Sequence, residues 1–252
     1  MSFGRCPKCR LPLDAARRSE TCPRCGLVFA KYLAAQRGER VPRPSPSIQD
    51  SYHVSFCSSL LEVPERVSRT QWIGRCFLFA LIAIWGWRIW ATDITELPTL
   101  VHLTLIPFHE AGHVVFWPFG EFMCVAGGTL GQWIIPIICA VVLHRQNGDN
   151  FGAAMAAWWL ATSVMDASVY AYDALDPVLP LIGGGTGADN FHDFVYLFEA
   201  MGQLDRARGW GRLLHFLGTL LMLGSLTWAG LILLRQRRKI GEGDSALPGN
   251  EP

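Results

Sequence analysis

The residues with the clearest chemical meaning are His109, Glu110 and His113, which form the pattern His-Glu-x-x-His inside the apolar stretch 97–117. Residues four apart share one face of a helix, so the two imidazoles can bind one metal ion. Glu110 lies beside them and can act as a base on a water molecule at that metal. Ionisable side chains in a membrane-length apolar segment are costly unless they have a function. The pattern predicts a zinc site with Glu110 as catalytic base; the alternative is a helix whose imidazoles only hydrogen-bond its neighbours.

A catalytic zinc ion usually has three protein ligands, so the pattern calls for a third. We expect Asp166, because it falls at about the depth of the two histidines if both segments cross the membrane side by side. Asp173 lies two helical turns further on and could orient one of the metal ligands without binding the metal ion itself. The alternates for the third ligand are His192 and Asp193, which follow a glycine-rich loop. In a further alternative, Asp166 only accepts a hydrogen bond between helices.

A second metal site is predicted near the N-terminus. Cys6 and Cys9 form one Cys-x-x-Cys pair, and Cys22 and Cys25 form another after a gap of twelve residues. Each pair can form a tight turn that offers two thiolates to one tetrahedral ion, and so short a segment needs the ion to fold. The pattern resembles a zinc ribbon, with a redox pair or disulfides as the alternative. Because an aromatic and basic stripe is missing, we expect a regulatory protein partner there and no nucleic acid.

Composition indicates a membrane protein, since half of the 252 residues are hydrophobic and they occur in long blocks. Pro118 and Gly120 are expected to end the segment that carries the histidines. A short helix at 192–201 is expected after the glycine-rich loop, capped by Asp189 or Asn190. We predict an all-α polytopic membrane protein with a small N-terminal zinc-ribbon module and about five transmembrane helices, at 72–91, 97–117, 127–143, 151–173 and 213–234.

The expected organisation is a zinc ribbon with a short helix at 1–40, a proline-rich linker at 41–71, a transmembrane domain at 72–239 and a flexible tail at 240–252. Residues 1–71 carry twelve Lys or Arg against six Asp or Glu, and no apolar core of a secretory signal opens the chain. We therefore expect an integral protein of the lipid bilayer, in a bacterial cytoplasmic membrane, with its N-terminus in the cytoplasm. Five passes would place the basic cluster 235–239 outside, against the tendency of Lys and Arg to stay inside.

Residues 97–175 resemble the site-2 protease family of intramembrane zinc metalloproteases. In that family one helix carries His-Glu-x-x-His, a second is entered through a glycine-containing turn, and a third brings an aspartate. The corresponding segments here are 109–113, 127–132 and 165–167, although Ala167 replaces the glycine after the aspartate and Thr162-Ser163 replaces an Asn-Pro pair. The resemblance implies a zinc endopeptidase that cleaves membrane protein substrates.

Two other functions are compatible with these patterns. One is a catalytically inactive membrane scaffold or metal-binding regulator that acts through the zinc ribbon. The other is a transporter with a His and Asp ion relay, which ranks lower because no inverted repeat is visible.

Overall fold

The structure is a computed structural model that describes residues 5–8, 10–12, 22, 27, 29, 32–33, 59–64, 67–96, 99–181 and 184–245. The chain divides into two compact units, Met1–Val54 and Ser55–Pro252, which are considered separately. The described residues are mostly helical, and in place of named strands they contain only two isolated β-bridges, Arg5 with Pro12 and Pro180 with Thr186.

The described residues of the N-terminal unit include two equivalent turns. The backbone N–H of Cys6 donates to the carbonyl of Leu11, and that of Cys22 donates to the carbonyl of Leu27, both at 2.9 Å. Both cysteines are buried, and Arg10, directly after the first pair, has a positive φ of 58°. Cys9 and Cys25 lie outside the described residues, so the four-cysteine zinc site stays a prediction.

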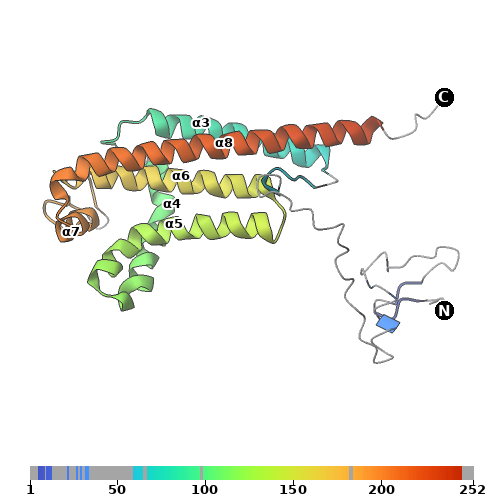
Figure 1. Cartoon of the computed structure of the whole chain (residues 1–252), viewed down its shortest axis with the longest axis horizontal. Coiled ribbons are helices and arrows are strands. Elements are labelled where there is room, and N and C mark those ends of the chain that lie inside the picture. Colours follow the sequence, from blue (N-terminus) through green and yellow to red (C-terminus); the bar gives the residue numbers. More distant parts are fainter. Residues whose placement is uncertain are drawn as a thin grey trace, which may run out of the picture. The chain divides into compact units, whose positions relative to one another are not determined.

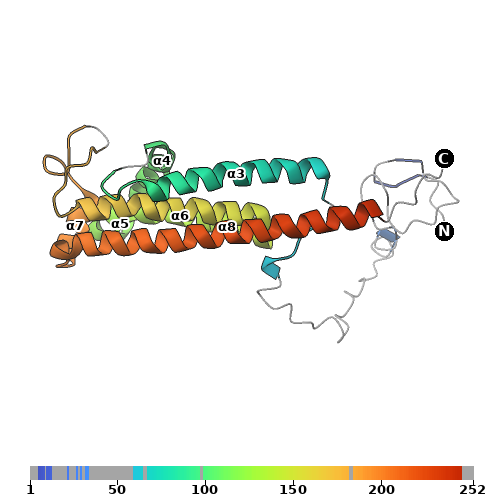
Figure 2. The same cartoon turned by 90° about the horizontal axis from the view of Figure 1, so that it is seen from above.

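The second unit is a helical bundle with α3 (Arg69–Ala91), α5 (Glu121–Arg145), α6 (Asn150–Asp173) and α8 (Ala207–Ser245) along its length (Figures 1 and 2). Neighbouring helices are antiparallel, because contacts pair the start of one with the end of the next. Trp72 of α3 donates its indole N–H to the carbonyl of Leu233 in α8, and His144 of α5 contacts Asn150 of α6. The bundle therefore has two ends, which are called the basal end (the start of α3 and α6) and the cavity end (the end of α3 and α6).

Helix α6 is the central element, packed between α8 on one side and α5 on the other. Its first turn is capped by Asp149, whose carboxylate accepts from Gly152 N–H. Alanine dominates its buried face, which lets neighbouring helices approach closely. A core of buried side chains joins α6 to three other helices and consists of Ile82, Ile89, Val101, Leu105, Trp158, Ala161, Met165 and Met222.

Helix α4 (Thr99–Phe116) runs steeply across the direction shared by α3, α6 and α8 (Figures 1 and 2). It ends in the 3-10 turn η2 (Trp117–Phe119), and Gly120, with φ of 97°, starts the chain back into α5. The resulting hairpin is packed through glycines, since a Cβ on Gly112 would overlap the carbonyl group of Gly127. The two helices can therefore touch backbone to backbone.

Three helices are long and apolar enough to cross a membrane, Arg69–Ala91, Glu121–Arg145 and Leu204–Glu242, which is compatible with a membrane protein. The count of five spans is not confirmed. Helix α6 matches the predicted fourth segment closely, α5 begins six residues before the predicted third one, and α8 continues beyond 234 through the basic cluster. At 39 residues, α8 is about 58 Å long, roughly twice the hydrocarbon thickness of a bilayer.

Part of the predicted linker packs on the basal end of the bundle. The side-chain amide of Asn150 donates to the carbonyls of Ser59 and Glu62, and Trp228 donates to that of Leu60. Arg235 and Lys239, from the basic cluster, donate to the carbonyls of Leu61 and Val63. Residues 59–64 thus belong to the bundle rather than to a free linker.

Candidate metal centre

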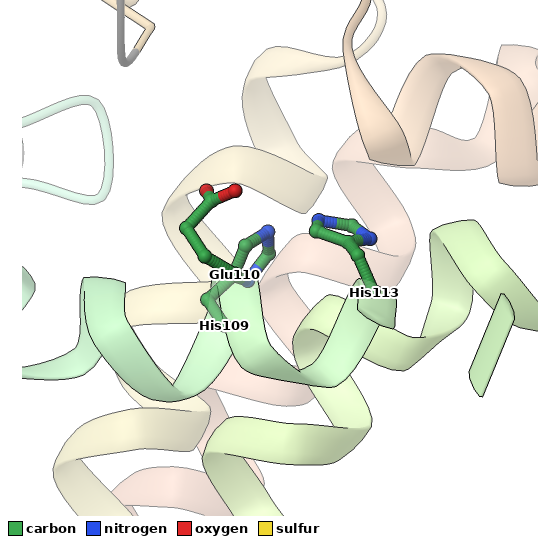
Figure 3. Close-up of side chains that lie close together, drawn as sticks. All are labelled: His109, Glu110 and His113. Carbon is green, nitrogen blue, oxygen red and sulfur yellow. The ribbon is translucent and has the colours of Figure 1, made fainter. Parts of the chain in front are cut away.

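His109, Glu110 and His113 project from the same side of α4 (Figure 3). Their possible ligand atoms all lie within 4.8 Å of one another, as the helical spacing predicts. The two imidazole rings are 4.8 Å apart between centroids and nearly perpendicular to each other. This arrangement leaves a space between the rings that a third group can face.

The third group is Asp193, the first residue of α7 (Asp193–Ala200). One of its oxygens, Oδ2, lies 2.9 Å from Nε2 of His109 and 3.3 Å from Nε2 of His113. Ligand atoms bound tetrahedrally at zinc distances are about 3.3 Å apart, so this spacing is close to that of a zinc site. Burial raises the pKa of Asp193, but its hydrogen bonds with His109 and His113 outweigh burial and lower the pKa to about 2. The carboxylate is therefore ionised and acts only as an acceptor.

The backbone fixes the orientation of His113. Its Nδ1 lies 2.8 Å from the carbonyl oxygen of Cys124, which can only accept, so Nδ1 carries the hydrogen. In the neutral ring, Nε2 then presents a lone pair toward the ionised Asp193. Two acceptors facing each other at 3.3 Å need a cation between them, either a shared proton or a metal ion. The donor set of His109, His113 and Asp193 fits zinc.

Gly128 of α5 forms the wall behind the imidazoles. A Cβ at this position would lie 2.6 Å from ring atoms of His109 and 2.7 Å from the Cε1 of His113. No larger residue fits unless the rings move. The sequence placed these glycines in a turn that enters a helix, but Gly127 and Gly128 lie inside α5, where Gly127 packs on α4.

The centre opens into a cavity of about 220 Å³. Glu110 is exposed at this cavity, on the same side of α4 as the two rings. Thr129 also lines it, and its buried Oγ1 has no hydrogen-bond partner among the described residues. The cavity is lined by α4, α5 and α6 and by the segment that leads into α7, with the side chains of His102, Ile106, His109, Glu110, His113, Thr129, Gln132, Asp166, Ala167, Tyr170, Leu181, Phe191, His192, Asp193 and Phe194.

Asp166 lies in the same cavity but contacts a different histidine. Both of its oxygens are 3.2 Å from Nδ1 of His102, and its side chain is 3% exposed. Tyr170 completes this cluster, with its hydroxyl 3.4 Å from Nε2 of His102 and donating to the carbonyl of Pro180 at 3.0 Å. The sequence expectation placed Asp166 with His109 and His113 because it assumed that α4 is parallel to α6. Since α4 runs steeply across, the residue that meets Asp166 is His102, two turns earlier.

His192 and Asp173 position the segment that carries Asp193. The Nδ1 of His192 accepts from Val195 N–H and so caps α7, a position that the sequence assigned to Asp189 or Asn190. Burial lowers the pKa of His192, and its Nε2 lies 3.7 Å from Asp173. The carboxylate of Asp173 also accepts from Val178 and Leu179 N–H. Asp173 thus contacts His192, one residue before Asp193, and holds the loop rather than either histidine of α4.

No protein-family model, curated protein or solved structure matches this chain. The likeness of residues 97–175 to site-2 proteases therefore stays a prediction from the motif, and the site is interpreted from its own geometry. Sequence reasoning missed His102, Tyr170 and the carbonyl of Cys124. For His102 a signal was present, because it lies seven residues before His109 and hence on the same helix face.

Proposed function

We propose that the chain is a zinc metalloendopeptidase of the membrane, cleaving peptide bonds in membrane-spanning or membrane-adjacent proteins. The observation that supports this most is the convergence of His109, His113 and Asp193, from two separate helices, beside Glu110 in one cavity. A structural metal site is normally closed by four protein ligands, whereas three ligands with a carboxylate at an open cavity are typical of hydrolytic sites. The second zinc ion of the proposal is structural and belongs to the four N-terminal cysteines.

His109, His113 and Asp193 would hold the catalytic ion, and Cys124 would orient His113 through its carbonyl. Zinc supplies Lewis acidity, which polarises a peptide carbonyl and makes a water molecule more acidic. The carboxylate of Glu110 accepts a proton from the attacking water and delivers it to the leaving amine.

The proposed substrate must enter as extended chain. A helical substrate keeps its carbonyls in internal hydrogen bonds, and a whole helix about 10 Å across does not fit a cavity of about 220 Å³. We therefore expect cleavage next to a helix end or at a site where the substrate helix unwinds.

Catalysis is tested with Glu110→Gln in the full chain, co-expressed with a panel of tagged single-span membrane proteins. Glu199→Gln, on the exposed side of α7 and outside the cavity, is the matched control. We expect the wild type and Glu199→Gln to cleave at the same rate and Glu110→Gln to be at least about 100-fold slower, because general base catalysis contributes that much. Zinc content should be equal in all three. If Glu110→Gln cleaves as fast as the wild type, the proposal fails and the inactive scaffold is favoured.

A further inference from the structure

The bundle places its charged residues unevenly between its two ends. The basal end collects the start of α3, the end of α5 and the last third of α8, with Arg69, Arg75, Arg145, Arg235, Arg237, Arg238 and Lys239. The cavity end has fewer Lys and Arg, namely Arg88, Arg206, Arg208 and Arg212, and Arg208 and Arg212 lie over the ring of Tyr172. It is also rich in acidic residues: Asp93, Glu96, Glu121, Asp176, Asp189, Glu199 and Asp205.

The direction of α4 changes the number of membrane passes. Helices α3, α5 and α8 each meet the length and hydropathy needed to span, and α6, at about 36 Å, lies between α5 and α8 over the same depth. Because α6 is covered by protein on both sides, it does not need an apolar surface toward lipid. Helix α4 starts and ends in the half of the bundle nearer the cavity end, so it adds no pass (Figures 1 and 2).

Exposed apolar side chains indicate that the α4–α5 hairpin is immersed in lipid. Val114, Val115, Trp117, Phe119 and Phe122 are all exposed around its turn. Aromatic residues are enriched where hydrocarbon meets water, and a patch of this kind is costly in water. Helix α4 and the turn into α5 therefore lie in the membrane near the cavity end without crossing it, with their backbone hydrogen bonds satisfied within the helices, and α5 makes the pass.

Resting on the proposed function, we propose that the chain crosses the membrane four times with both termini in the cytoplasm, and that the catalytic cavity opens on the extracytoplasmic side. Four passes bring the basic cluster 235–239 to the same side as the basic residues 1–71, which removes the conflict that five passes create. Asp166, the innermost carboxylate of the cavity, is about 10 Å from the end of α6, so the cavity lies close to that surface. The substrate is therefore a segment of a membrane protein at or just outside its extracytoplasmic helix end.

The test is the accessibility of single introduced cysteines in intact cells that express the full chain. Ala188→Cys reports on the exposed loop at the cavity end, and Glu242→Cys reports on the exposed end of α8 at the basal end. A membrane-impermeant maleimide is applied before and after permeabilisation, with the unmodified chain as background for its native cysteines. We expect Ala188→Cys to be labelled in intact cells and Glu242→Cys only after permeabilisation.

Every other labelling pattern overturns the proposal. Labelling of both positions in intact cells would mean that α8 does not cross the membrane between them. Labelling of Glu242→Cys alone in intact cells would mean that the orientation is inverted. Labelling of Ala188→Cys only after permeabilisation places the cavity on the cytoplasmic side. The experiment does not depend on catalysis, because Glu110→Gln must label like the parent chain. Failure of the topology is thus distinguishable from failure of the protease proposal.

Discussion

At the scale of single residues, the cavity holds two separate His–Asp arrangements. One oxygen of Asp193 is shared between His109 and His113, whereas Asp166 is paired with His102 and lies next to Tyr170. In the first arrangement a neutral His113 would face the carboxylate with a lone pair, so a shared proton or a metal ion must lie between them. In the second, a single N–H of His102 facing the carboxylate satisfies the contact, so no ion is needed. The two carboxylates are expected to respond differently to substitution.

We predict that Asp193→Ala lowers the zinc content of the purified full chain from two ions to one, while Asp166→Ala leaves it at two. The physical reason is that only Asp193 faces both imidazoles of the His-Glu-x-x-His pattern. Metal analysis of the purified variants measures this, with Cys22→Ser as the control that removes the other ion. Two ions in Asp193→Ala together with one in Asp166→Ala would return the ligand to Asp166.

At the scale of elements, the α4–α5 hairpin determines where the histidines stand. Its helices touch through Gly112, Gly127 and Gly131, and Gly128 leaves room for the two imidazoles. Small residues at these positions replace the hydrophobic driving force that is missing between helices in lipid. The proposed metal centre therefore depends on glycines that are not themselves metal ligands.

We predict that Gly112→Ala destabilises the detergent-solubilised protein and lowers occupancy of the membrane zinc site. The added methyl group would overlap the Gly127 carbonyl group, and relief of such overpacking typically costs about 1–3 kcal/mol. Gly224→Ala in α8 is the matched control, because a Cβ there meets nothing within 4 Å. Thermal unfolding with metal analysis compares the two. Equal melting temperatures for both variants would show that the close approach of α4 to α5 is not required.

At the scale of the whole molecule, residues 59–64 pack on the basal end of the bundle, which is the end opposite the cavity. They are held through their backbone carbonyls by Asn150, Trp228, Arg235 and Lys239. Because these contacts are made to backbone carbonyls, they depend on the positions of the donors and hardly on which side chains residues 59–64 carry. The interaction thus joins the chain that follows the predicted ribbon to α6 and α8.

We predict that Asn150→Ala speeds proteolytic cleavage near residues 59–64 of the solubilised full chain. The substitution removes two hydrogen bonds to residues 59–64 and the 2.6 Å contact with Nδ1 of His144, at a cost of roughly 1–3 kcal/mol. Asn147→Ala, in the exposed turn after α5, is the control. Limited proteolysis read by mass spectrometry follows the cleavage. Unchanged cleavage in Asn150→Ala would mean that this side chain does not hold the segment.

The sequence by itself determined what depends on local spacing. Residues four apart on a helix share a face whatever the fold, so the grouping of His109, Glu110 and His113 was predictable. The end of the helix near Pro118 and Gly120 was predictable as well. The apolar lengths of α3, α5 and α8 likewise indicated membrane helices. The cap of α7 was missed, since a histidine at that position is a weaker signal than Asp189 or Asn190.

Only the tertiary structure decided which carboxylate meets the two histidines, and only it carries the proposal of four membrane passes. Both depend on the angle of α4 to the bundle, and that angle is set by backbone contact at Gly112 and Gly127 and by the turn at Gly120. Hydrophobic periodicity contains no information on such an angle, because an oblique helix and a spanning helix bury similar faces. The distance between α4 and Asp193, eighty residues later, follows from packing alone.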